Sequence, residues 1–134
     1  MRTKRSEDLA LFLAPIVGLL AFVVPVFILS PKQYDSPLFP LVRTGIEGAS
    51  SLTYILLFLG ALGLGTAFKV SPWLLGVCCM AGFPLLAFAE MTYDPSSHNL
   101  WPIEFLIYAG TSLVSVAGAF AGGTLRELFS KSEA

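Results

Sequence analysis

Four long apolar stretches, separated by short polar or proline-containing segments, dominate the pattern along the chain. They run from about Leu9 to Leu29, Leu52 to Phe68, Trp73 to Met91 and Ile103 to Leu125. Each is close to the ~20 residues that an α-helix needs to cross the hydrocarbon core of a bilayer. None alternates apolar and polar residues as a barrel strand does, which leaves helices as the spanning structure. The pattern therefore predicts an all-α membrane protein, a four-helix transmembrane bundle.

The residues at the ends of these stretches set the predicted bounds. We expect one transmembrane domain over residues 1–134, with helices at about 7–29, 48–68, 72–92 and 102–126 and outer loops at 30–47 and 93–101. Pro72 and Pro102 each suit the first turn of a helix. The stretch Arg43 to Ser51 is a candidate for the first turns of the second helix, lifted above the lipid. Kinks are expected where prolines fall inside helices, at Pro15, Pro25 and Pro84.

Composition excludes a water-soluble domain and a nucleic-acid partner. Hydrophobic residues make up 55% of the 134 residues and charged residues only 13%. A globule of this size cannot hide so many apolar side chains from water. In a lipid bilayer the same side chains can face the lipid, so the bilayer is the expected partner. The net charge is −1 and no basic patch is present to neutralise phosphates. Cys78 and Cys79 lie inside an apolar run, which is typical of packing residues.

Lysine and arginine are distributed unevenly between the two predicted sides of the membrane. Six basic residues fall on the side of the N-terminus: Arg2, Lys4, Arg5, Lys69, Arg126 and Lys131. The opposite side holds only Lys32 and Arg43. Because cytoplasmic loops are enriched in basic residues, both termini are predicted to be cytoplasmic. The membrane itself is predicted to be a plasma or inner membrane.

Small residues recur every four positions in the last predicted helix. They are Thr111, Ser115, Ala119 and Gly123, with Gly118 and Gly122 beside them. Helices in lipid associate by close backbone approach, which small side chains permit. The stripe predicts a tight contact through this helix, either within the chain or between copies in a homo-oligomer or larger membrane complex.

The ionisable groups concentrate in one short segment, residues 89–104. It contains the only histidine and three of the nine acids, and Asp35 and Glu47 are expected on the same side of the membrane. Polar groups near an apolar span are often functional. We predict an acidic binding site on the outer face for a cation, a lipid headgroup or a basic segment of a partner. Its expected ligand-binding residues are Glu90, Tyr93, Asp94, His98, Asn99 and Glu104.

Several chemistries remain open for these side chains. Glu90 and Asp94 lie one helical turn apart and, together with His98, are candidate ligands for a divalent cation, although their spacing matches no specific metal motif. Titration of His98 near neutral pH would instead give a proton-linked role. Structural roles are the alternatives: an ion pair from Glu90 to Arg43, a turn at Asp94, hydrogen bonds from His98 to its loop, and Glu104 at the positive end of a helix dipole.

A non-enzymatic binding role is the leading hypothesis. A structural accessory subunit is the second, and a small transporter, channel or membrane-embedded metal-dependent enzyme is the third. The apolar spans contain almost no charge, which disfavours a conducting path. A serine hydrolase built from Ser96 or Ser97, His98 and Asp94 is disfavoured because no nucleophile elbow is present.

Overall fold

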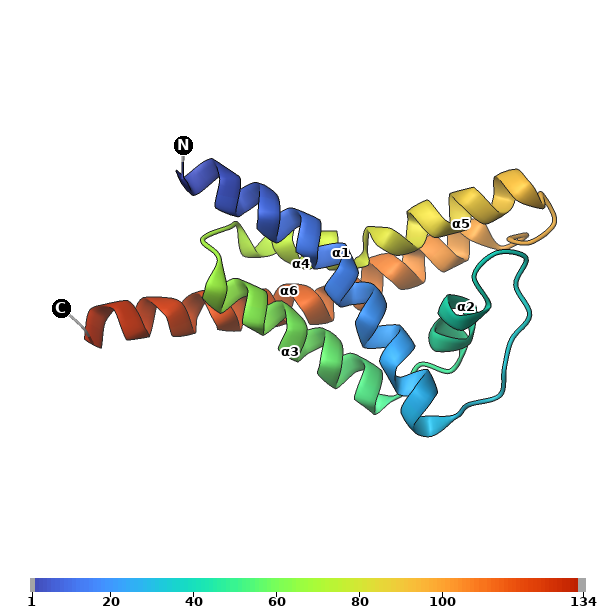
Figure 1. The fold of residues 1–134 in the computed structure, drawn as a ribbon, viewed down its shortest axis with the longest axis horizontal. Helices are drawn as coiled ribbons and strands as arrows, with labels where there is room; N and C mark the ends of the chain where they lie inside the picture. Colours follow the sequence, from blue (N-terminus) through green and yellow to red (C-terminus); the bar gives the residue numbers. More distant parts are fainter. Residues whose placement is uncertain (1, 133–134) are drawn as a thin grey trace.

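A computed structural model describes residues 2–132, with side chains from Lys4 onward, and every regular element in that range is an α-helix. The helices are α1 (Arg2–Leu29), α2 (Pro40–Glu47), α3 (Ser51–Ala67), α4 (Pro72–Met80), α5 (Gly82–Tyr93) and α6 (Trp101–Ser132). Figure 1 shows that the start of α1 and the end of α6 lie at the same end of the molecule, which we call the terminal end. Helix α2, the segment before it and the α5–α6 turn lie at the opposite end, which we call the loop end.

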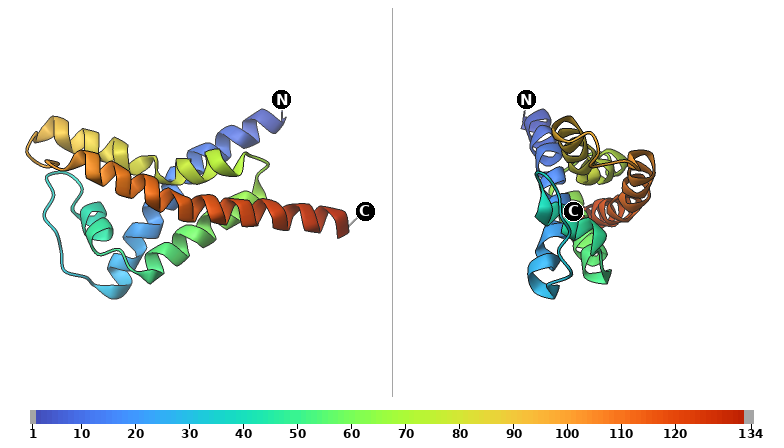
Figure 2. Two further views of the ribbon diagram at one scale, coloured as in Figure 1. Left: turned by 180° about the vertical axis from the view of Figure 1, so that it is seen from behind. Right: turned by 90° about the vertical axis from the view of Figure 1, so that its right-hand side faces the viewer.

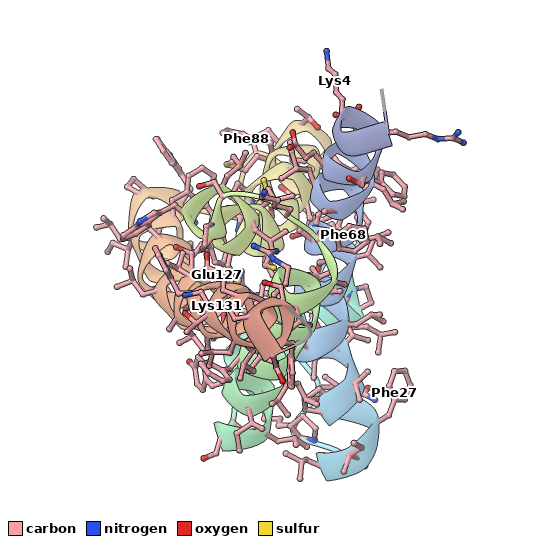
Figure 3. All side chains as sticks on the ribbon, turned by 90° about the vertical axis from the view of Figure 1, so that its left-hand side faces the viewer. Lys4, Phe27, Phe68, Phe88, Glu127 and Lys131 are labelled. Atoms are coloured by element: carbon pink, nitrogen blue, oxygen red, sulfur yellow. The ribbon has the colours of Figure 1, made fainter. Side chains whose placement is uncertain are left out.

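Three helical stretches are long and apolar enough to cross a membrane, namely α1, the α4–α5 pair and α6. Helix α3 provides a fourth if it is counted together with α2, from which it is bent by 106°. The all-helical prediction is confirmed. Large apolar side chains point outward, as lipid-facing residues would; Phe12 and Leu106 are 66% and 72% exposed. Figure 3 shows Phe27 projecting away from the neighbouring helices.

Helix α2 was expected only in part: it lies inside the predicted outer loop 30–47, although the stretch from Arg43 was a candidate for the first turns of the second helix. Pro40 presets its first turn, and Gly45 lets it pack tightly against the Phe22 carbonyl of α1. After α2 ends, the Ser50 N–H donates to the Thr53 hydroxyl at 3.1 Å and starts α3 in a new direction. The predicted second helix therefore begins at residue 51 instead of 48.

Three other boundaries also differ from the prediction. The third predicted helix is divided at Ala81 into α4 and α5, because Pro84 has no N–H to donate to the preceding turn. Helix α1 begins at Arg2, before residue 7, and α6 continues to Ser132, past residue 126. Both helices therefore extend further than predicted at the terminal end.

Close backbone contacts hold the helices together, and α6 packs against both α3 and α4 (Figure 2). A Cβ atom at Gly118 or Gly122 would overlap with the carbonyl oxygens of Phe58 and Leu62 on α3. The buried Ser115 hydroxyl donates to the Gly76 carbonyl of α4 at 2.7 Å. The small-residue stripe therefore makes its tight contact within the chain.

Candidate functional site

Three ionisable residues of the loop end form one cluster around a buried histidine. Glu90 comes from the last turn of α5, His98 from the α5–α6 turn and Glu104 from the first turn of α6. The His98 Nε2 atom lies 2.6 Å from a Glu90 carboxylate oxygen, and its Nδ1 atom lies 2.5 Å from a Glu104 carboxylate oxygen. The imidazole is only 5% exposed. We call Glu90, His98 and Glu104 the triad.

The α5–α6 turn positions His98 between the two glutamates. Asp94 ends α5 with an extended backbone, and its carboxylate accepts hydrogen bonds from the Ser96 N–H at 3.0 Å and the Ser96 hydroxyl at 2.7 Å. The His98 carbonyl then accepts from the Trp101 N–H as α6 begins. This compact reversal brings the last turn of α5 beside the first turn of α6.

Glu90 also binds the segment that precedes α2. Its second carboxylate oxygen accepts hydrogen bonds from the Ser36 hydroxyl, from the Phe39 N–H at 3.1 Å and from the Leu38 N–H at 3.4 Å. Phe39 is the N-cap residue of α2 and supplies no side-chain cap. A carboxylate from α5 therefore satisfies backbone donors at the start of α2, where negative charge is favourable.

Arg43 connects the triad to α2. Its guanidinium lies 3.3 Å from Glu104 and 2.9 Å from Glu47, one turn further along α2. The predicted alternative, an ion pair between Arg43 and Glu90, is replaced by these two pairs. Helices α2, α5 and α6 thus share one continuous network of charges and hydrogen bonds.

The geometry of the triad determines how many protons it holds. A hydrogen bond at each ring nitrogen of His98 requires two protons among the three groups. Either the imidazolium donates to two carboxylates, or a neutral imidazole donates to one carboxylate and accepts from a protonated one. Both arrangements give the triad a net charge of −1. Arg43 and Glu47 add charges that cancel, so the extended cluster also carries −1.

The structure brings together three of the six predicted ligand-binding residues. The Asp94 side chain bonds to its own turn, and its link to the triad is through the backbone, where its N–H donates to the Glu90 carbonyl at 2.7 Å. Those two bonds from Ser96 hold the pKa of Asp94 below its usual value. Asn99 is exposed, and Tyr93 is 70% exposed.

No metal centre is evident among the described residues, where no group of three His, Cys, Asp or Glu side chains is placed to hold an ion. In the triad, the imidazole separates the two carboxylates, so the three groups do not converge on one point as zinc ligands do. The divalent-cation site at Glu90, Asp94 and His98 therefore stays a prediction, and these side chains do not converge on one point in the structure.

Sequence reasoning missed two side chains of this site. Ser36 lies 54 positions before its partner Glu90, and a lone serine in a loop carries no signal of such a contact. Tyr108 was not considered, although it follows Glu104 by one helical turn and therefore shares its face of α6. The chain matches no protein-family model, no curated protein and no solved structure.

Proposed function

We propose that the chain is a multi-pass protein of the plasma or inner membrane, with four spans and both termini in the cytoplasm, whose outer end binds a proton in the triad. The apolar spans support the membrane assignment. Six of the eight basic residues belong to segments at the terminal end, in agreement with the positive-inside rule, and this supports the orientation.

The observation that carries the proposal is that both ring nitrogens of a buried histidine are hydrogen-bonded to carboxylates. The predicted ligands were a cation, a lipid headgroup or a basic segment of a partner. Of these, a proton fits the triad best, because the oxygens of Glu90 already have donors and leave no room for a larger ion. Proton binding here is shared among coupled groups and belongs to the triad as a unit.

Proton binding would determine how tightly the loop end is closed. The groups that face His98 are Glu90 from α5 and Glu104 from α6, and Arg43 from α2 acts on it through Glu104. With two protons, both bonds of the imidazole form. Alkaline pH removes one proton and breaks a bond, whereas strong acid adds a third and removes a charged acceptor. The loop end is therefore tightest at intermediate pH.

Trp101 provides a fluorescent reporter of loop-end closure, because it follows the triad turn directly and packs edge to face against Phe105. The sequence has two tryptophans, so Trp73→Phe leaves Trp101 alone. In liposomes, we expect its emission to shift reversibly when the outer pH is changed. His98→Gln should abolish the shift, and Asp94→Asn, a charge change outside the triad, should preserve it. An equal shift in the His98→Gln protein would refute the proposal.

An accessory-subunit or homo-oligomer role is less well supported. Gly118 and Gly122, which suggested assembly through the last helix, pack against α3 of the same chain. A contact between copies would have to use another surface.

A further inference from the structure

A cavity of about 140 Å³ lies beside the triad, between α2 and α6. Its lining residues are Arg43, Ile46, Glu47, Glu104, Ile107 and Tyr108. The triad itself is closed, because its nitrogen and oxygen atoms bind one another and the segment before α2. The cavity therefore provides a space beside the triad that a molecule larger than a proton can enter.

Tyr108 is an unusual polar group in the wall of this cavity. Its side chain is only 6% exposed, and its ring packs against Phe83 and Phe105 with centroid distances of 5.7 and 5.9 Å. No hydrogen bond joins its hydroxyl to another described residue, and this oxygen is not fully enclosed, so it is open to the cavity that Tyr108 lines. A ligand in the cavity would supply a hydrogen-bond partner.

The charges around the cavity alternate in sign. Arg43 lies between Glu47 and Glu104, and all three side chains are partly exposed. A guanidinium binds phosphate oxygens well, and a carboxylate accepts hydrogen bonds from an ammonium group. Ile46 and Ile107 add apolar walls, and Ile107 is more than half exposed on the outer surface of α6. A zwitterionic headgroup attached to an apolar tail complements this arrangement of charges and walls.

We infer that the cavity binds the phosphoethanolamine headgroup of a membrane phospholipid. Arg43 and the Tyr108 hydroxyl would hold the phosphate, and Glu47 and Glu104 would hold the primary ammonium. The glycerol end would leave past Ile107 toward the lipid. A quaternary choline has no N–H to donate, and a phosphatidylglycerol has no cation, so both are expected to bind less well. This inference goes beyond the proton site, with which it shares Glu104, and it does not require the triad to bind a proton.

Native mass spectrometry of the full chain in detergent tests the inference, with titrations of phosphatidylethanolamine, phosphatidylcholine and phosphatidylglycerol. We expect phosphatidylethanolamine to bind about tenfold more tightly than the other two, a difference of about 1.4 kcal/mol. Arg43→Gln should weaken it about tenfold and Tyr108→Phe severalfold. Glu47→Gln, a change at the rim, should reduce the preference over phosphatidylcholine. Lys32→Gln, the matched control at the same end, should change nothing.

Two results would overturn the inference. One is equal affinity for the three lipids in the unmodified protein. The other is unchanged phosphatidylethanolamine binding in both the Arg43→Gln and Glu47→Gln proteins, whose thermal unfolding serves as the check of folding. Water-soluble glycerophosphoethanolamine is a further arm; it should bind more weakly than the lipid, and equal binding would reject a membrane lipid as the source of the headgroup.

Discussion

At the scale of residues, the triad is explained by the cost of burying charge. A buried ionised group is stable only when its hydrogen-bonding capacity is filled. Glu90 meets this condition through Ser36, two backbone N–H groups and His98, and Glu104 meets it through His98 and Arg43. The same contacts connect three helices, so the chemistry and the architecture of the loop end are inseparable.

Asp94 provides a prediction about pH in the same turn. The hydroxyl and the N–H of Ser96 donate to its carboxylate and lower its pKa from the usual 3.8. The stabilisation that ionised Asp94 gives to the turn is therefore complete when the pH is above the usual pKa. It is lost as the pH falls through the lowered pKa. A ¹³C NMR titration of the Asp94 carboxyl should give a midpoint below 3.8, and Ser96→Ala should raise it. A midpoint unaffected by Ser96→Ala would contradict this account.

Part of the site was predictable because ionisable residues are rare in this chain. Glu90, His98 and Glu104 were identified from their position beside apolar spans, and the structure brings them together. Asp94 was expected to share a helical face with Glu90, but α5 ends at Tyr93 and the aspartate is used in the turn. Helical spacing predicts a shared face only while the helix continues.

At the scale of helices, the contact between α3 and α6 depends on glycine. Gly118→Leu or Gly122→Leu would force a side chain into the α3 backbone, and overpacking of this kind costs about 1–3 kcal/mol or more. Gly110 lies on the same helix with open space around it, so Gly110→Leu is the matched control. Reversible unfolding in mixed micelles should show a large decrease in the free energy of unfolding for the first two variants and almost none for the control. Equal losses would place the α3–α6 contact elsewhere.

The helices themselves were predictable to different degrees. The long apolar helices follow from hydropathy, because an apolar segment in lipid must satisfy its own backbone hydrogen bonds. Helix α2 has eight residues, too few to be stable alone, and it depends on contacts with α1 and Glu90 that no local pattern reveals. The break at Ala81 was anticipated as a kink from Pro84, but its division of the span into α4 and α5 was not.

At the scale of the whole molecule, the two ends differ in chemistry. The terminal end carries most of the basic residues, with Lys4 and Lys131 visible there in Figure 3. The loop end carries the triad, Arg43 and the cavity beside it. The apolar surface between them contains large exposed side chains such as Leu85 and Leu113, which water would not tolerate in such number. In the proposed membrane orientation, this division places the polar chemistry on one side of the bilayer.

The central claim is that His98 shares two protons with Glu90 and Glu104. Because His98 is the only histidine, ¹⁵N-histidine labelling reports on this site alone. Proton NMR of the labelled protein in lipid should show two slowly exchanging downfield protons, one at each ring nitrogen. Glu90→Gln should remove the one at Nε2, and Glu104→Gln the one at Nδ1. A single ring proton in fast exchange with water, unaffected by either substitution, would contradict the account.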